Sequence, residues 1–249
     1  MILEVDFGNT RLKWRLLDPV RLLVESSGIV SSVSEFSAEL GRQTLSNVSF
    51  ARACSVRGND ENQQLATLIN SEFGVELHLA QSQAELAGVR NGYLEPAKLG
   101  VDRWLAILGA YAQVKGACLV IDCGTAITAD YIEADGVHLG GCIAPGIKLM
   151  NKALLGSTNI PADLVGLVKQ EDRVSVGRTT EQAIASGIRA MVLGFIAEQA
   201  RLAKQKIGLE LSVVASGGDS ELVREVVPEV VIDKDLVFAG LAIACPYFA

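Results

Sequence analysis

The residues best suited to chemistry lie in two short turns, the first near the start of the chain. An apolar run ends at Asp6, and the next residues, Gly8, Asn9 and Thr10, form a turn before apolar residues resume at Leu12. This pattern predicts a strand, a tight turn and a second strand, with a carboxylate and a hydroxyl at the turn.

The second turn repeats the first near the middle of the chain. Residues 117–122 are apolar up to Asp122, the run breaks at Gly124, and Thr125 precedes a β-prone run over 126–132. We interpret the pair as a duplicated phosphate-binding hairpin, and the chain as two related halves that close on one nucleotide.

Each turn offers groups that bind phosphate. Backbone amides over residues 8–10 and 124–126 could donate to phosphate oxygens, and Thr10 and Thr125 add hydroxyl donors. Lys13 would add a positive charge. Glycine matters in these turns because a Cβ would hold the backbone away from the ligand.

The two aspartates are better suited to cations than to phosphate, which they would repel. Asp6 is expected to hold Mg²⁺ or a water bound to it, since Mg²⁺ prefers carboxylates and waters. Asp122 could do the same or hold a second cation.

Composition limits the partners. The 249 residues carry a formal net charge of −7 and no block of Lys or Arg, which disfavours nucleic acid and anionic membranes. No apolar run approaches about 20 residues, so no membrane span is expected. Five cysteines without C-x-x-C spacing favour a reducing cytoplasm, and the acidic start with Glu4 predicts no signal peptide.

Hydrophobic periodicity predicts an α/β protein with halves at 1–115 and 116–249. The first half should hold strands at 2–6, 11–17, 20–30, 48–56 and 75–80, and helices at 34–45 and 60–73. A helix should open at Gly100 and lead to the second half. There we expect strands at 117–122, 126–132, 137–143, 211–216 and 230–232, and helices at 147–155, 180–206, 220–227 and after 235. Residues 81–99 and 156–176 are expected to be loops.

Several candidate residues also have a purely structural interpretation. Asp102 lies in the first turn of the helix that opens at Gly100, where an acid is favoured by the helix dipole. His78 and His138 lie in strand-like runs, where histidine is more often structural than catalytic. No nucleophile elbow or zinc-protease motif occurs, and Asp122 should raise the pKa of Cys123. The remaining candidate reaction is phosphoryl transfer, which needs mainly positioning and charge neutralisation.

Five motifs, taken together, resemble those of the type III pantothenate kinases, within the acetate and sugar kinase, heat-shock chaperone and actin superfamily. They occur in the family's order along essentially the whole chain: Asp6-Phe7-Gly8-Asn9-Thr10, Leu99-Gly100-Val101-Asp102-Arg103, Asp122 to Thr128, Gly140-Gly141 with Pro145-Gly146, and Thr180 with Ala183 and Ser186-Gly187. The chain departs from the pattern at Phe7, Thr179 and Ser216.

The resemblance implies two ribonuclease-H-like domains, and it assigns roles to residues. Asp102 would be the general base for the pantothenate hydroxyl. The residues expected around pantothenate are Tyr93, Gly100, Val101, Asp102, Arg103 and Thr180. Those expected at ATP are Asp6, Gly8, Asn9, Thr10, Lys13 and Thr125. Asp122 would bind a monovalent cation, K⁺ or NH₄⁺, and the protein would be a cytoplasmic homodimer with its substrate site near the subunit contact.

Three alternatives stay open. The chain could be a kinase of the same superfamily with another acceptor, a nucleotide-dependent switch or filament module like actin, or a regulatory relative that keeps the fold without catalysis. An acceptor panel, an assembly assay and a low-salt gel shift would respectively distinguish them.

Overall fold

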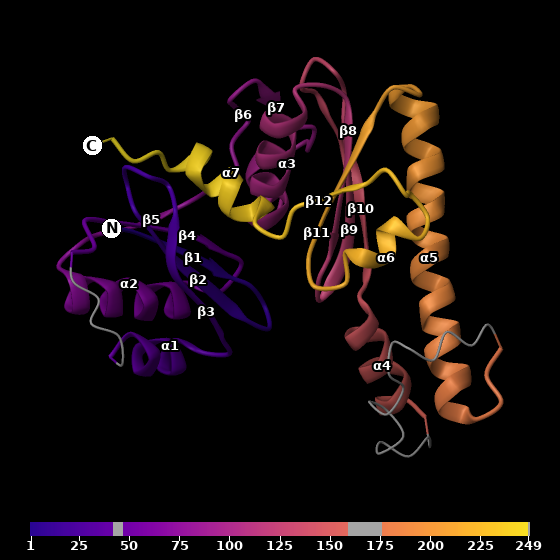
Figure 1. The fold of residues 1–249 in the computed structure, drawn as a ribbon, viewed down its shortest axis with the longest axis horizontal. Coiled ribbons are helices and arrows are strands. Elements are labelled where there is room, and N and C mark those ends of the chain that lie inside the picture. The colour runs from indigo at the N-terminus through magenta and orange to yellow at the C-terminus, as the bar shows by residue number, and fades with distance from the viewer. Residues whose placement is uncertain (42–46, 159–175, 249) are drawn as a thin grey trace. The chain divides into compact units, whose positions relative to one another are not determined.

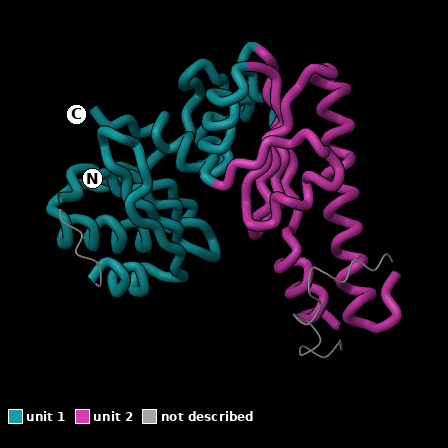
Figure 2. Tube along the Cα trace, viewed as in Figure 1, with its two compact units in different colours: residues 1–115, 135–140, 235–249 teal, residues 116–134, 141–234 magenta. Residues whose placement is uncertain are grey.

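The computed structural model describes residues 1–41, 47–158 and 176–248. The chain forms two compact units (Figure 2). Unit 1 contains residues 1–115, 135–140 and 235–249, and unit 2 contains residues 116–134 and 141–234. Two segments from the second half of the chain, residues 135–140 and 235–249, are therefore part of the same unit as residues 1–115.

Unit 1 is built on a five-stranded sheet with the order β3-β2-β1-β4-β5. The strands are β1 (Ile2–Phe7), β2 (Leu12–Leu17), β3 (Val24–Val30), β4 (Phe50–Ser55) and β5 (Leu77–Leu79). β1 and β2 form the predicted antiparallel hairpin, in which Asp6 is opposite Lys13, and β4 lies parallel to β1 on the other side.

Alternation along β1 decides which side chains meet which helices. Leu3, Val5 and Phe7 enter the core formed with α1 (Val33–Leu40) and α2 (Asn59–Phe73), which lie on the same side of the sheet (Figure 1). Because successive side chains of a strand point to opposite faces, Glu4 and Asp6 face the other side, where α3 (Val101–Val114) and α7 (Leu236–Ala244) pack.

Helices α3 and α7 pack closely because glycines lie at their crossing. A Cβ on Gly240 would lie 1.9 Å from the carbonyl oxygen of Leu105, and one on Gly109 would lie 2.5 Å from that of Leu236. Only residues without a side chain allow the two backbones to approach this closely. α3, which carries Asp102 in its first turn, thus packs firmly against α7.

A buried ion cluster fastens the C-terminal segment to the sheet. Glu4 is fully buried, and its carboxylate accepts from Arg15 and Arg52, with N–O distances of 2.5 Å to each. Arg52 Nη1 also donates to the carbonyl of Cys245 at 2.7 Å, and Arg15 pairs with Asp235 at 3.2 Å. Both arginines therefore connect the first sheet to the two ends of α7.

Unit 2 repeats the sheet of unit 1, with the order β10-β9-β8-β11-β12. Its strands are β8 (Cys118–Cys123), β9 (Ala126–Ile132), β10 (His138–Pro145), β11 (Ser212–Ser216) and β12 (Val231–Ile232). β8 and β9 are antiparallel, and β11 is parallel to β8, as β4 is to β1. The repetition confirms the predicted pair of ribonuclease-H-like domains related by internal duplication.

The long helix α5 (Thr180–Ile207) supplies the core of unit 2. Val192, Ile196 and Ala200 are buried against the sheet. Among the described residues, α5 alone is long and apolar enough to cross a membrane by length and composition, and 22% of its apolar window is buried in the structure. The described part of unit 2 also contains the helices α4 (Ile147–Gly156) and α6 (Glu221–Arg224).

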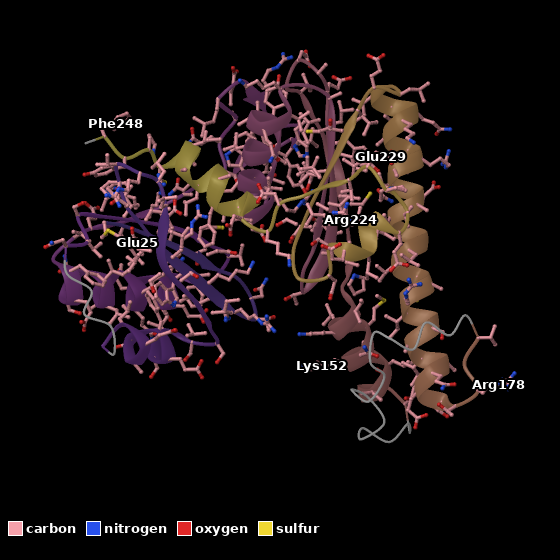
Figure 3. The ribbon with its side chains drawn as sticks, in the orientation of Figure 1. Glu25, Lys152, Arg178, Arg224, Glu229 and Phe248 are labelled. Carbon is pink, nitrogen blue, oxygen red and sulfur yellow. The ribbon has the colours of Figure 1, made fainter. Side chains whose placement is uncertain are left out.

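Charged side chains of both signs lie on the outside of each unit. The labelled basic residues of unit 2, Lys152, Arg178 and Arg224, come from different parts of the chain (Figure 3). Arg224 pairs with Glu221 within α6, and Arg201 with Glu198 within α5.

The elements differ from the predicted ones mainly at their ends. β3 begins at Val24 and not at residue 20, because the carboxylate of Asp18 accepts from the amides of Val20 and Arg21 and turns the chain. α6 stops at Arg224, short of the predicted end at residue 227. The predicted loop over 81–99 contains a small hairpin, β6 (Glu85–Leu86) and β7 (Val89–Arg90), and a 3₁₀ turn at Pro96–Lys98. Parts of the predicted helix 34–45 and loop 156–176 lie outside the described residues.

Candidate active site

The first phosphate-binding turn connects β1 to β2 and is held by its own backbone. The amide of Gly8 donates to the carbonyl of Arg11 at 3.0 Å, which closes the turn, while Asn9 and Thr10 are exposed. Arg57 Nε donates to the carbonyl of Gly8 at 3.0 Å. These hydrogen bonds fix the two ends of the turn, and its central residues, Asn9 and Thr10, are exposed to solvent.

Asp6 is a half-buried carboxylate with incomplete charge compensation. Its side chain is 13% exposed, and its Oδ2 lies 3.5 Å from Nζ of Lys13, which is 40% exposed. Burial raises the pKa of Asp6, the Lys13 ammonium lowers it, and the charge of Asp102 raises it further. A cation near Asp6 would offset the cost of burying this charge.

Replacing Asp6 by asparagine is expected to stabilise unit 1 at neutral pH. Because the folded-state pKa of Asp6 is raised above 3.8, the unfolded chain loses this proton first, and stability falls as pH rises through the interval between the two values. Asp6→Asn removes that loss. Thermal unfolding from pH 4 to 8 should therefore show a gain in Tm that grows with pH.

Asp18→Asn is the matched control, with the opposite sign. Hydrogen bonds from the amides of Arg21 and Val20 lower the pKa of Asp18, so its carboxylate stabilises the fold above the unfolded-state pKa. This variant should lose stability at neutral pH. A lower Tm for Asp6→Asn than for the wild type at pH 7 would contradict the desolvation argument.

Asp102 lies in the first turn of α3, where the local backbone fixes its carboxylate. Oδ1 accepts from the amide of Arg103 at 2.8 Å. A Cβ on Gly100 would lie 2.7 Å from the same oxygen, so glycine leaves room for the carboxylate. The charge of Asp102 reaches both Asp6 and the buried Cys54, whose pKa is raised mainly by burial and then by these two carboxylates.

Tyr93 and Arg103 form a second pair within unit 1. Arg103 is 6% exposed, and its Nη1 donates to the hydroxyl of Tyr93 at 2.6 Å. The guanidinium carbon of Arg103 also lies 5.5 Å from the centroid of the Tyr93 ring. A guanidinium paired with a phenol, next along the chain to Asp102, is suited to binding a carboxylate or phosphate group.

The second turn, in unit 2, is held by close backbone contacts. The amide of Gly124 donates to the carbonyl of Ala126, and that of Gly146 donates to the carbonyl of Thr125, both at 2.9 Å. A Cβ on Gly146 would lie 2.5 Å from the carbonyl oxygen of Thr125. The glycine of the Pro145-Gly146 motif thus allows β10 to pass against this turn.

Asp122, the second-last residue of β8, lies beside a glycine that the sequence did not single out as a functional residue. Gly217 has φ +90°, and a Cβ there would lie 2.7 Å from Asp122 Oδ1 and 2.4 Å from the carbonyl oxygen of Cys123. Both the positive φ and the close approach require glycine. The pKa of Cys123 is raised to about 12, mainly by burial and then by Asp122 and Asp219, which agrees with the predicted direction and disfavours thiolate chemistry.

The structure brings some of the predicted residues together. Asp6, Lys13 and Asp102 interact in unit 1, and Gly100 and Val101 lie next to Asp102 in the chain. Asp122 and Thr125 share the turn of unit 2. Thr180 is the exposed first residue of α5, and Thr179 caps the helix by accepting from the amide of Gln182. That Asp6 and Asp122 serve one nucleotide stays a prediction.

Sequence reasoning also missed Arg57. It lies 49 residues from Gly8, and its guanidinium carbon is 5.0 Å from the centroid of Phe7, one of the residues that depart from the family pattern. A basic residue in a loop carries no periodicity, so only the parallel pairing of β1 with β4 brings it to the turn.

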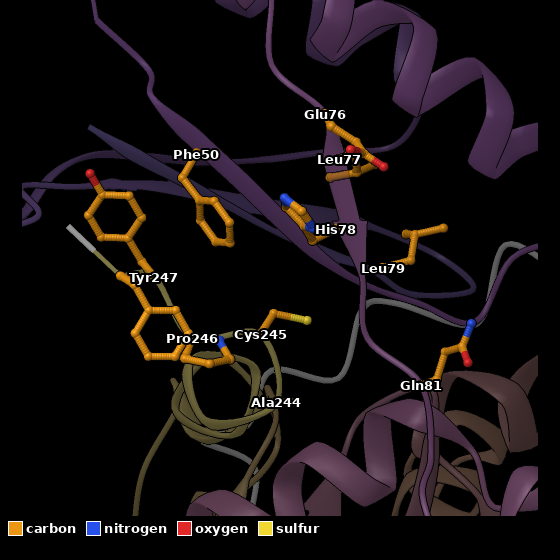
Figure 4. Close-up of a pocket in the computed structure, with 11 residues that line it drawn as sticks. Phe50, Glu76, Leu77, His78, Leu79, Gln81, Ala244, Cys245, Pro246 and Tyr247 are labelled. Atoms are coloured by element: carbon orange, nitrogen blue, oxygen red, sulfur yellow. The ribbon is translucent and has the colours of Figure 1, made fainter.

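A pocket of about 690 Å³ lies elsewhere in unit 1 (Figure 4). It is lined by β4, β5 and the C-terminal segment, including Phe50, His78, Cys245 and Tyr247, and it contains none of the predicted site residues. His78 stacks on Phe50 with ring centroids 4.7 Å apart. Within the part of the chain that the structure describes, no three His, Cys, Asp or Glu residues gather as a metal site. Cation binding at Asp6 or Asp122 would therefore depend on waters, backbone oxygens or phosphate oxygens as further ligands.

Comparisons with known proteins identify the family and support the fold. A sequence model of the type III pantothenate kinase family matches residues 2–202. A protein named type III pantothenate kinase from Pseudomonas putida (strain F1) is 43% identical over 247 residues, which is 99% of each chain. Among solved structures, a putative Baf family transcriptional activator from Campylobacter jejuni has a TM-score of 0.61 at 18% identity, covering 96% of this chain and 94% of that one. A putative 2-dehydro-3-deoxygalactonokinase from Sinorhizobium meliloti has a TM-score of 0.60 at 13% identity, covering 99% and 100%. These two structures support the fold alone.

Proposed function

The chain belongs to the type III pantothenate kinase family, and from this premise we propose that it phosphorylates pantothenate with ATP. The product would be 4′-phosphopantothenate, the first intermediate on the way to coenzyme A. The observation that carries the proposal is that Asp102 lies within electrostatic range of Asp6 in unit 1, which brings an acid suited to take a proton near an acid suited to hold a cation.

The proposed reaction is a direct in-line transfer. The terminal hydroxyl oxygen of pantothenate attacks the γ-phosphorus of ATP, the bond from that phosphorus to the bridging oxygen breaks, and ADP leaves. The hydroxyl proton passes to the carboxylate of Asp102, which acts as general base. The hydrogen bond from the Arg103 amide holds Oδ1, so Oδ2 is the oxygen left to accept the proton.

The substrate contacts follow from the residues around Asp102. Arg103 would neutralise the pantothenate carboxylate, and the hydroxyl of Tyr93, which Arg103 holds, would orient its polar groups. Gly100 and Val101 would contact pantothenate through their backbone at the start of α3. These contacts would keep the ligand close to the carboxylate of Asp102. We assign Thr180 to the same substrate on the family resemblance.

The nucleotide would be held through both glycine turns. In unit 1, the backbone and side chains of Gly8, Asn9 and Thr10 would bind phosphate, and Lys13 would add its charge. In unit 2, Thr125 would contribute a hydroxyl. Mg²⁺ near Asp6 would neutralise charge on the phosphates, and Asp122 would hold a monovalent cation, K⁺ or NH₄⁺.

The family resemblance also supports a cytoplasmic homodimer. Sedimentation velocity of the purified protein would test this part of the proposal.

The proposed function predicts ADP release that depends on pantothenate. With the purified protein, ATP and Mg²⁺, a coupled assay should show release only when pantothenate is added. The rate should be higher in K⁺ or NH₄⁺ than in Na⁺ at equal ionic strength. An acceptor panel of sugars and acetate serves as the control. Equal release without pantothenate, or faster release with another acceptor, would contradict the proposal.

A further inference from the structure

The loop that carries Tyr93 is shaped by the tip of the β9–β10 hairpin, residues 135–138. These residues belong to unit 1. The amide of Arg90 donates to the carbonyl of Gly136 at 2.9 Å, and Arg90 Nη2 pairs with Asp135 at 2.8 Å. The hairpin tip therefore lies directly against the start of the Tyr93 loop.

Two glycine contacts bring the two segments to backbone distance. A Cβ on Gly136, which has φ +84°, would lie 2.0 Å from the carbonyl oxygen of Gly88. A Cβ on Gly92 would lie 1.7 Å from the carbonyl oxygen of His138. Such close backbone contacts leave the loop little freedom to shift along the hairpin.

His138 is the hairpin residue that contacts the loop with its side chain. It is fully buried, and its Nδ1 accepts from the amide of Gly92 at 3.4 Å. Its ring stacks on that of Tyr93, with centroids 6.2 Å apart and an angle of 13° between the rings. Tyr93 in turn accepts from Arg103 at 2.6 Å. One continuous chain of contacts thus leads from His138 through Tyr93 to Arg103.

We propose that His138 is a positioning residue for the pantothenate site: it holds Tyr93 in the orientation in which its hydroxyl meets Arg103. This inference rests on the proposed function, since it assigns Tyr93 and Arg103 to pantothenate. It goes further by giving the hairpin tip a role in substrate affinity. Nδ1 of His138 accepts from the Gly92 amide and so fixes the loop backbone, while the face of the imidazole ring packs against the ring of Tyr93.

Two substitutions separate these contributions. His138→Phe keeps an aromatic face for Tyr93 but removes the acceptor for the Gly92 amide. His138→Asn keeps an acceptor but removes the ring. Each should raise KM for pantothenate by about 3- to 10-fold, the loss that one aromatic contact or one hydrogen bond commonly causes. KM for ATP should stay within about 2-fold of the wild type, because the groups assigned to ATP lie outside this chain of contacts.

The other histidine gives the matched control. His78 also stacks on an aromatic ring, but it is exposed and lies in the pocket of Figure 4. His78→Phe and His78→Asn should leave both KM values unchanged. A double-mutant cycle adds a test that a general packing defect would not pass. His138→Phe should raise KM for pantothenate less in a Tyr93→Ala background than in the wild type, since it acts through Tyr93.

The outcomes decide between the inference and its alternatives. Circular dichroism identifies which variants are folded, and only these are compared. If His138→Phe and His138→Asn are unfolded, His138→Gln is measured instead. Unfolding of all three would assign His138 to the core alone and overturn the inference. Unchanged KM values, equal rises for both substrates, or additivity in the cycle would also overturn it while the wild type remains active. A wild type without pantothenate-dependent activity would overturn the proposed function itself.

Discussion

Replacing Asp102 by asparagine is expected to lower kcat for pantothenate phosphorylation by about 10²- to 10⁴-fold, the usual contribution of a general base. Asparagine keeps the size of the side chain and an oxygen that can accept from the Arg103 amide, so the start of α3 should persist. It cannot take the proton of the attacking hydroxyl. Initial-rate kinetics would measure the loss, and calorimetry should show that ATP and pantothenate still bind.

The control for this prediction is Asp60→Asn. Asp60 also lies in the first turn of a helix of unit 1, but it is exposed and belongs to α2. Its replacement should leave kcat unchanged. If Asp102→Asn turned over pantothenate at close to the wild-type rate, Asp102 would have only the helix-dipole role that its position also allows.

The second large effect is expected at the crossing of α3 and α7. Gly240→Ala would place a Cβ 1.9 Å from the carbonyl oxygen of Leu105, and backbone atoms cannot rotate away as a side chain can. The helices must separate, which we expect to cost about 3 kcal/mol or more, at the upper end for overpacked cores. Thermal unfolding should show a fall in Tm of roughly 6–12 °C for a domain of this size.

A glycine in an uncrowded part of a helix is the matched control. Gly194 lies within α5, and a Cβ there would have no atom within 4 Å. Gly194→Ala should therefore stabilise the protein by about 0.5–1 kcal/mol through helix propensity. Because α3 carries Asp102 at its start, Gly240→Ala should also reduce activity. A Tm for Gly240→Ala equal to that of the wild type would mean that the two helices can separate at little cost.

The hairpins and their carboxylates could be predicted because they depend on local patterns. Apolar runs predicted strands at 2–6 and 11–17 with a glycine turn between them, and the structure has them at Ile2–Phe7 and Leu12–Leu17. In the observed register Asp6 is opposite Lys13. The repetition around Asp122 then predicted the second sheet, whose strand order matches the first.

The contacts that complete unit 1 could not be predicted, because they join distant segments through features without a local signature. The apolar sequence of α7 is equally suited to either half, and only its packing on α3 assigns it to the first. The sequence around His138 is typical of a structural histidine in a strand. Its contact with Tyr93 depends on how the loop that carries Tyr93 packs against the tip of the β9–β10 hairpin. The start of β3 was predicted too early because Val20, Leu22 and Leu23 are apolar, although the carboxylate of Asp18 accepts from the amides of Val20 and Arg21 and turns the chain there.

The position of α7 has a consequence for how the protein is made. Translation releases the chain from its N-terminus, so residues 1–115 leave the ribosome long before residues 235–249, which belong to the same unit. All of unit 2 is synthesised in between. During that interval Glu4, Arg15 and Arg52 lack the contacts from the last helix, and α3 lacks its glycine-lined partner. Unit 1, including the start of α3 with Asp102, is therefore completed only after residues 235–249 have been synthesised.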